Sequence, residues 1–402
     1  MTTPDESHSK TTNVPAPSWL RGFHPGWFGA VMGTAVVGIV ASKNPGGFSA
    51  LATTTKDLSI GAVALAALLA VLVGTAYLAR WIHYPRDAWA DMRDPAVGPL
   101  HATFPGGTLV LAVGIAAVGP QVLPVSSVPT VVEVLVAIGV PLALAVSLVF
   151  AYLLFTLDLA DTRLVNGGWF IPPVVTIIVP VVLVPLLTQV QRPAARLLLF
   201  TGYAFYGVGF VLFLLVLGIL HDRLVTRELP PSGIAPSLWI VLGPTGIGAA
   251  ALVELAHATV SVLGPKAGPI ELMSLVGATA IWGFGAWWLL VASFLIGRYV
   301  THGGIAYGVG WWGFTFPLGA LTLATTTLAT GWSIPVMGDV AFGLLAALVL
   351  VWLAVATRTL VSLVSGPERG RLASRREPPV SDAPLSSAPR EIRTERTAAF
   401  HR

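Results

Sequence analysis

Ten long apolar segments dominate this sequence and restrict the folds available to it. A helix needs about 20 apolar residues to cross the hydrocarbon core of a bilayer, and the segments reach or approach that length. Only 10% of the residues are charged, against about 25% in a typical soluble domain. We therefore predict an all-α polytopic membrane protein with ten transmembrane helices. The segments are 25–42, 60–82, 101–119, 130–157, 169–189, 197–220, 236–262, 270–297, 305–330 and 337–364.

Polar stretches flank this apolar region and divide the chain into three parts. Residues 1–22 form a polar segment without an apolar core beside a small-residue cleavage site, so we expect no signal peptide. Residues 23–364 are predicted to form the transmembrane domain. Residues 365–402 are rich in Arg, Ser, Pro and Glu and are predicted to be a disordered tail. The charged connection 83–100 is predicted to be a structured surface loop.

The distribution of basic residues predicts the orientation in the membrane. With the tail excluded, nine Lys and Arg residues fall on the side of the N-terminus and five on the opposite side. Cytoplasmic connections carry the excess of basic residues in membrane proteins. We therefore expect both termini in the cytoplasm and the protein in the plasma (inner) membrane.

The sequence lacks the residues that several classes of function require. The chain has no cysteine, so it offers no disulfide and no thiolate chemistry. No grouping of residues resembles a metal site, a nucleophile with its base or a phosphate-binding loop. The basic charge lies largely in the tail and does not require a nucleic-acid partner. We therefore expect no enzymatic activity, no cofactor and no metal.

Prolines divide the apolar segments into two kinds. Each odd-numbered segment has a proline near or within it, whereas the even-numbered ones are smoother runs of Leu, Val and Ala, with Pro141 as an exception. In segment 305–330, Pro317 removes a backbone donor and is expected to kink or break the helix. Lipid cannot satisfy the freed carbonyl, so such a break belongs against protein or a wet cavity. We predict five helical hairpins, with odd helices forming a central pore and even helices an outer ring.

Four motifs together resemble the tellurite-resistance/dicarboxylate transporter (TDT) family. That family includes bacterial tellurite-resistance proteins, fungal malate and sulfite transporters and the slow anion channels of plant guard cells. The motifs are PGWFGAVMGT at 25–34, WFIPP at 169–173, LGPTG at 242–246 and WGFTFP at 312–317. The resemblance spans 23–362 and implies five hairpins around a five-helix pore, in a homotrimer with one pore per subunit. One departure concerns substrate choice: Ile247 stands where transporter-like members often have glutamine.

The resemblance also implies a gate, a phenylalanine on the ninth helix that closes the pore midway. By position this residue is Phe316, with Phe314 as the second candidate. Packing against lipid or a neighbouring helix is the alternative role for the Phe316 ring.

The expected lining of the pore suits small anions. Broken helices expose backbone N–H groups and half-helix dipoles, which favour negative charge without a fixed cation. Threonine hydroxyls can add weak binding that still permits release. The alternative is that Gly, Pro and Thr serve only helix packing, as they often do in membranes. The residues predicted to line or kink the pore are Gly33, Thr34, Phe104, Pro105, Pro172, Pro173, Gly243, Pro244, Thr245, Thr315 and Pro317.

Two ionisable residues fall within the seventh segment. Glu254 and His257 are three residues apart, so they share a helix face and could form a proton relay. The alternative is that both lie near the end of the helix, hydrated or bridging to a neighbour.

We predict transport of small anions, in the direction of efflux: sulfite, a C4-dicarboxylate such as malate, tellurite or inorganic anions. A proton-coupled carrier requires Glu254 or His257 to face the path. The alternative is a passive anion-selective channel of the slow-anion-channel type, which needs no titratable group there. A membrane scaffold would leave the prolines unexplained. The expected partners are the anion, the lipid bilayer and further copies of the chain.

Overall fold

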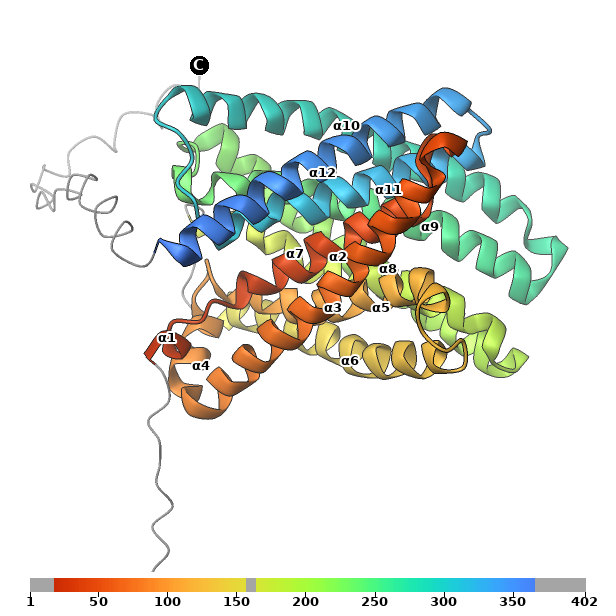
Figure 1. The fold of residues 1–402 in the computed structure, drawn as a ribbon, viewed down its shortest axis with the longest axis horizontal. Helices are drawn as coiled ribbons and strands as arrows, with labels where there is room; N and C mark the ends of the chain where they lie inside the picture. Colours follow the sequence, from red (N-terminus) through yellow and green to blue (C-terminus); the bar gives the residue numbers. More distant parts are fainter. Residues whose placement is uncertain (1–17, 157–163, 366–402) are drawn as a thin grey trace, which may run out of the picture. The chain divides into compact units, whose positions relative to one another are not determined.

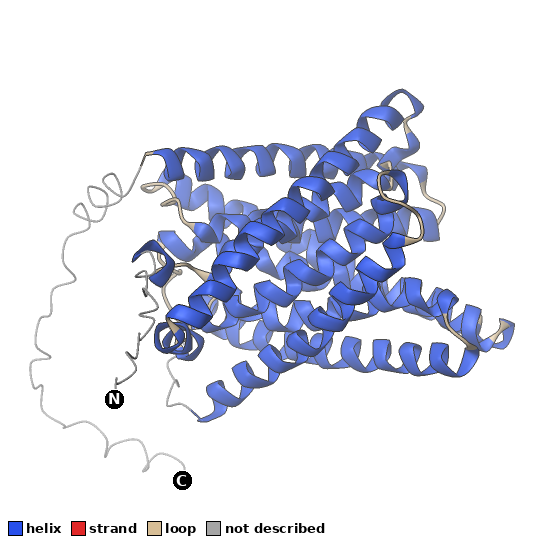
Figure 2. Cartoon of the chain, turned by 60° about the horizontal axis from the view of Figure 1, so that its bottom comes forward, coloured by secondary structure: helices blue, strands red, loops and turns tan. Residues whose placement is uncertain are grey.

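The computed structural model describes residues 18–156 and 164–365, and every regular element in them is a helix (Figures 1 and 2). Most of the predicted N-terminal segment 1–22, and all of the predicted tail except Ser365, lie outside these residues. The chain divides into two compact units, residues 1–357 and 358–402. The second unit is described only at its start, where residues up to Val364 continue a helix. The remaining paragraphs concern the first unit.

All ten predicted segments contain an α-helix. The boundaries differ most at the ninth segment, where the α-helix begins well after the start of the apolar run, and at the second, where it begins earlier. The helices are α1 (Ser18–Arg21), α2 (Phe28–Ser42), α3 (Ala52–His83), α4 (Pro85–Arg93), α5 (Thr103–Val118), α6 (Ser127–Thr156), α7 (Ile171–Leu183), α8 (Arg192–Thr226), α9 (Leu242–Leu263), α10 (Pro269–Thr301), α11 (Thr315–Gly331) and α12 (Pro335–Val364).

Nine helical spans in the described ranges are long and apolar enough to cross a membrane. The ninth predicted segment is not among them. Its α-helix, α11, has only 17 residues, and six of these are threonines, which lower its hydropathy. The structure therefore supports a polytopic membrane protein, and the count of ten spans stays a prediction.

Burial separates the helices into two groups. In the most apolar stretch of the spans that contain α2, α5, α7 and α9, between 78% and 83% of the residues are buried within the protein. The corresponding share for α3, α6, α8, α10 and α12 is only 17% to 28%. Most residues of α11 are buried as well. Exposed apolar helices are what lipid contact requires.

The buried helices pack in a closed ring. α2 contacts α5, α5 contacts α7, α7 contacts α9, α9 contacts α11, and α11 returns to α2. We call these five helices the inner ring. The exposed helices α3, α6, α8 and α10 each pack against two neighbouring members of it. α12 contacts it through Trp352, whose Nε1 donates to Thr34 Oγ1 at 3.0 Å, and Val355, which packs with Ala30 and Trp312.

Pro317 does not break α11 in its middle, as the sequence led us to expect, and Pro180 is the proline that stands inside an inner helix, near the end of α7. Instead, each inner α-helix follows a short 3-10 segment, and a proline stands in its first turn or in the 3-10 segment itself. Thus η11 (Val309–Phe314) precedes α11, and Pro317 is the third α-helical residue. A proline is tolerated there because the first turn has no intrahelical partner for its N–H. The other 3-10 segments are η1 (Pro25–Trp27), η4 (Gly98–Ala102), η7 (Gly167–Phe170) and η9 (Ser232–Val241).

Three hairpins have the same kind of hydrogen bond, each at the end of the hairpin opposite its connecting loop. In each, a side chain late in the outer helix donates to a backbone carbonyl before the 3-10 segment of its own inner helix. Arg80 of α3 donates through Nε to the carbonyl of Arg21 at 3.0 Å. In the same way Arg223 of α8 donates to Val165 and Tyr299 of α10 to Pro230. These bonds fix where each of the three inner helices begins.

The connection 83–100, predicted as a surface loop, contains the helix α4. Two of its side chains, Ala88 and Met92, are buried, while Trp89 is exposed beneath the guanidinium of Arg93, 5.3 Å from the ring centre. An aromatic ring beside a cation suits the boundary between lipid and water. The prediction missed this helix because four of its nine residues are charged, so it shows no apolar run.

Candidate functional site: a path through the inner ring

Three cavities lined by described residues lie within the inner ring, and the side chain of Phe316 stands between the first and the second. The N-terminal cavity, about 70 Å³, is lined by early residues of the inner helices and their 3-10 segments. The middle cavity, about 20 Å³, also has Phe316 in its wall and has room for about one water molecule. The C-terminal cavity, about 230 Å³, shares Ile39, Val113, Val181 and Leu323 with the middle one. The three therefore follow one another along a single path.

The inner helices line this path with residues spaced three and four apart. Such spacing places side chains on one face of a helix, so each helix presents one continuous stripe to the cavities. The stripes are almost entirely apolar. They comprise Met32, Val36, Ile39 and Lys43 on α2; Val110, Val113 and Ala117 on α5; Ile171, Val174, Ile178 and Val181 on α7; Gly243, Ile247, Ala250 and Glu254 on α9; and Phe316, Ala320, Leu323 and Thr327 on α11.

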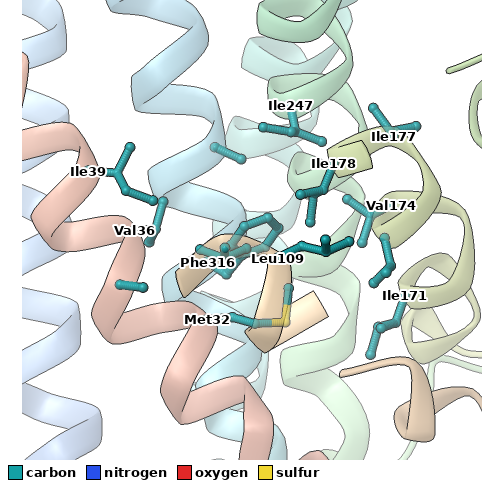
Figure 3. Packing of buried hydrophobic residues seen from close by; sticks show 14 of the residues in the cluster. Met32, Val36, Ile39, Leu109, Ile171, Val174, Ile177, Ile178, Ile247 and Phe316 are labelled. Carbon is teal, nitrogen blue, oxygen red and sulfur yellow. The ribbon is translucent and has the colours of Figure 1, made fainter. Parts of the chain in front are cut away.

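Phe316 lies at the centre of this arrangement. Its side chain is only 6% exposed, and Figure 3 places it between Val36 of α2 and the α7 residues Val174 and Ile178. Gly243 of α9 faces the ring: a Cβ built there would lie 3.7 Å from Phe316 Cε1. The structure thus brings Phe316, Gly243 and Pro317, three residues predicted for the pore, to the wall of one cavity.

Phe314, the second candidate for the gate, has a different environment. Its ring packs edge-on against Trp239, with centroids 5.6 Å apart, and against Trp311 at 6.1 Å. It is half-buried, and it is not part of the wall of the three cavities. Because Phe314 and Phe316 are two residues apart across the joint between η11 and α11, they point to different sides.

The polar groups of the N-terminal cavity are few. His24 lines it and accepts a hydrogen bond from the Gly26 N–H through Nδ1 at 3.1 Å. Burial lowers the pKa of His24; Asp91 opposes this shift and Arg80 adds to it. Thr103, also in the wall, donates to the carbonyls of Pro25 and Leu100 at 2.9 and 2.6 Å. The neutral imidazole and the engaged hydroxyl leave this cavity with little fixed charge.

The C-terminal cavity carries two charged side chains, Lys43 and Glu254. Glu254 is half-buried and faces the cavity, whereas His257 is exposed. His257 lies instead beside Glu271 of α10, with Nε2 and Oε1 3.9 Å apart. The structure therefore places one member of the proposed relay on the path and brings the other to a different carboxylate.

Most of the remaining predicted pore residues form hydrogen bonds within their own helical segment or contact a neighbouring helix. Thr245 donates to the carbonyls of its own preceding turn, both at 3.1 Å, and Thr315 donates to the Trp312 carbonyl at 2.8 Å. Thr34 accepts from Trp352, as described above. A Cβ at Gly33 would meet Thr315 Oγ1 at 1.9 Å, so this glycine allows α2 and α11 to approach. Pro105 and Pro244 are buried in first helical turns.

Three further predicted residues contact groups outside the path. Phe104 opens α5 with the same Thr-Phe-Pro motif that opens α11, yet its ring packs against Phe28 and Tyr77 at 4.8 and 5.2 Å. Pro172 and Pro173 line an apolar pocket of about 90 Å³ with residues of α6 and α8. The described residues contain no group of three or more His, Asp or Glu side chains that could hold a metal ion.

Comparison with known families decides what kind of protein this is. The sequence profile of the family described as SLAC1, voltage-dependent anion channel, matches residues 22–360. The chain belongs to the SLAC1 family. This confirms the predicted TDT relationship, and it identifies the chain as a membrane protein of an anion-transporting family.

Individual proteins also resemble the chain over most of its length. An uncharacterized transporter of Methanocaldococcus jannaschii is 28% identical over 87% of this chain and 97% of its own. The sulfite efflux pump SSU1 of Trichophyton rubrum is 27% identical over 79% of this chain and 84% of its own. The malic acid transport protein of Schizosaccharomyces pombe is 24% identical over 77% and 71%.

The sequence did not reveal most of the residues that line the path in this SLAC1-family chain. Met32, Val36, Val174 and Ile178 are apolar, like residues that face lipid, and composition alone cannot separate the two. A signal was present in their spacing, since the stripe on α2 recurs every three or four residues and ends at Lys43.

Proposed function

We propose that the chain moves small anions along the path through the inner ring and that Phe316 is its gate. The observation that carries the proposal is the position of this side chain, which forms part of the wall of both the N-terminal and the middle cavity. A nearly buried aromatic ring between two cavities blocks an ion until it moves. The N-terminal cavity offers space for that movement, because five of its lining residues are glycines.

The lining of the path supports weak binding and fast release. Val, Ile, Leu and Phe side chains surround the constriction, and a narrow apolar neck excludes water when closed. In the described residues that line the three cavities, the only permanent cation is Lys43, at the far end. An anion therefore meets no strong binding site at the gate. The first turns of the inner helices supply partial positive charge instead.

The proposed substrates follow from the relatives. A sulfite efflux pump and a malic acid transport protein both resemble the chain over most of its length, so we propose sulfite or a C4-dicarboxylate as the anion and efflux as the direction. Tellurite and inorganic anions stay within the proposal. A passive channel without proton coupling is the second candidate, and it is favoured by the absence of an ionisable side chain in the described wall of the middle cavity.

Purified protein in proteoliposomes tests this proposal. We expect wild-type protein to accelerate the efflux of at least one of chloride, nitrate, sulfite and malate over protein-free vesicles. Each anion is measured with and without a pH gradient. Flux that the gradient leaves unchanged supports the passive channel, and flux that the gradient drives uphill supports the carrier. If wild-type and Phe316→Ala vesicles are both as tight to all four anions as protein-free controls, the proposed function is contradicted.

We further propose ten spans, both termini in the cytoplasm, insertion in the plasma membrane and a homotrimer with one path per subunit. The excess of basic residues supports the orientation. A reporter active only in the cytoplasm is expected to give signal when fused after Arg402 and none when inserted after Gly331, between α11 and α12. The reverse pattern would place the termini outside. Chemical cross-linking of native membranes, with trimers as the expected product, tests the assembly.

A further inference from the structure

The C-terminal cavity differs from the rest of the path in its charge. Residues late in three inner helices converge on it, namely Ala117 of α5, Val182 of α7 and Thr327 of α11. The C-terminal end of a helix carries about −0.5 of an elementary charge. An anion that has passed Phe316 therefore enters a space where several negative helix ends meet, which opposes its passage.

Lys43 and Glu254 are the charged side chains in the wall of this cavity. Lys43 stands at the C-cap of α2, where a cation compensates the negative helix end. Glu254 lies more than two turns inside α9 and is half-buried. Among the described residues, neither side chain has an ion-pair or hydrogen-bonding partner. A carboxylate that served only to hold helices together would need such a partner.

We propose that Lys43 and Glu254 form an electrostatic filter that sets how fast anions of different charge cross the C-terminal cavity. This inference rests on the proposed function. Lys43 raises the local concentration of anions, and ionised Glu254 lowers it. The two residues act on the ion through space, so their effect grows with the charge of the ion.

The charge of the ion gives the filter a quantitative signature. A single charge that faces a water-filled space changes the local concentration of a monovalent ion by about threefold. A divalent ion has twice the energy in the same potential, so the corresponding factor is squared, to about ninefold. A change of packing or of cavity size has no reason to follow this relation.

Four variants in proteoliposomes test the filter, with chloride as the monovalent probe and malate as the divalent one. Glu254→Gln is expected to raise chloride flux about threefold and malate flux about ninefold. Lys43→Gln is expected to lower both by similar factors, and the double variant to return within about twofold of wild type. These differences are expected to shrink as salt is raised to 1 M, where screening acts over about 3 Å. The fourth variant, Glu271→Gln, is the matched control.

The control removes the same charge from a position outside the cavity. Glu271 lies near the start of α10 beside His257, with 41% of its side chain exposed, and flux through Glu271→Gln is expected to match wild type. All measurements are repeated in a Phe316→Ala background, so that a closed gate does not hide the effect. Thermal unfolding and size-exclusion profiles check that each variant is folded.

Three results would overturn the filter. Equal flux in Glu254→Gln and Glu271→Gln would show that Glu254 does not act on the ion. A loss of flux in Glu254→Gln, restored by no change of salt, would assign the carboxylate to proton transfer instead. Equal factors for chloride and malate would point to cavity shape. If neither wild type nor Phe316→Ala conducts any anion, the proposed function itself fails.

Discussion

Replacing Phe316 with alanine is expected to raise anion flux through the closed protein about tenfold or more. The side chain separates the N-terminal and middle cavities and is only 6% exposed, so an anion passes only when the ring moves. Displacing a side chain from a tightly packed rotamer costs about 1–3 kcal/mol, and about 1.4 kcal/mol corresponds to a factor of ten in rate. The alanine variant has no ring to displace. Flux of chloride or sulfite from proteoliposomes measures the change.

Two phenylalanines serve as controls for this substitution. Phe314→Ala removes a ring that packs on Trp239 and Trp311, and Phe104→Ala removes one from the same Thr-Phe-Pro motif in α5. Both variants are expected to be less stable, with flux near that of wild type. A well-folded Phe316→Ala protein with unchanged flux, beside a conducting Phe314→Ala protein, would reassign the gate. Unchanged flux in all three would end the aromatic-gate mechanism for this chain.

Gly246→Ala is expected to prevent α9 and α11 from packing as they do in the native inner ring. A Cβ at this position would lie 2.4 Å from the carbonyl carbon of Ala320 and 2.4 Å from the amide nitrogen of Leu321. Both are backbone atoms, which cannot move aside as a flexible side chain can. We expect destabilisation at the upper end of the about 1–3 kcal/mol typical of overpacking. It appears as a lower midpoint in thermal unfolding followed by size-exclusion chromatography.

The same helix supplies the matched control. Gly248 is also buried in α9, but a Cβ there would have only the Phe210 ring near it, at 3.8 Å, which is ordinary contact. Gly248→Ala is therefore expected to keep or raise stability, because alanine favours helix over glycine by about 1 kcal/mol. If both variants unfold at the wild-type temperature, α9 and α11 are further apart than the structure places them.

The sequence predicted the helices well because long apolar runs can form little else in a bilayer. The proline-containing segments were predicted to form the inner helices, and these are the segments that the structure buries. The effect of Pro317 was predicted at the wrong place. The preceding residues of η11 look as helical as those of α11, and the change from 3-10 to α-helix depends on packing against η9 and α2.

The candidate site was predicted less completely than the fold. The assignment of Phe316 rested on a family resemblance, whereas the two Thr-Phe-Pro motifs are locally identical and only tertiary contacts turn Phe104 away from the path. The proposed pairing of Glu254 with His257 used helix spacing alone and could not anticipate Glu271 on the neighbouring helix. Lys43 belonged to no motif, and its position on the path follows from the stripe of α2.

The closed order of the inner ring has a consequence for biogenesis. Its members follow the chain from α2 to α11, and the contact between these two completes it. A membrane protein is synthesised from its N-terminus, so the contacts of α11 with α9 and α2 form after the other contacts of the ring. The last inner helix to be synthesised, α11, is also the one that carries Phe316. A polypeptide interrupted before α11 therefore exposes an incomplete ring to lipid. The complete path first exists with the Phe316 side chain already in it.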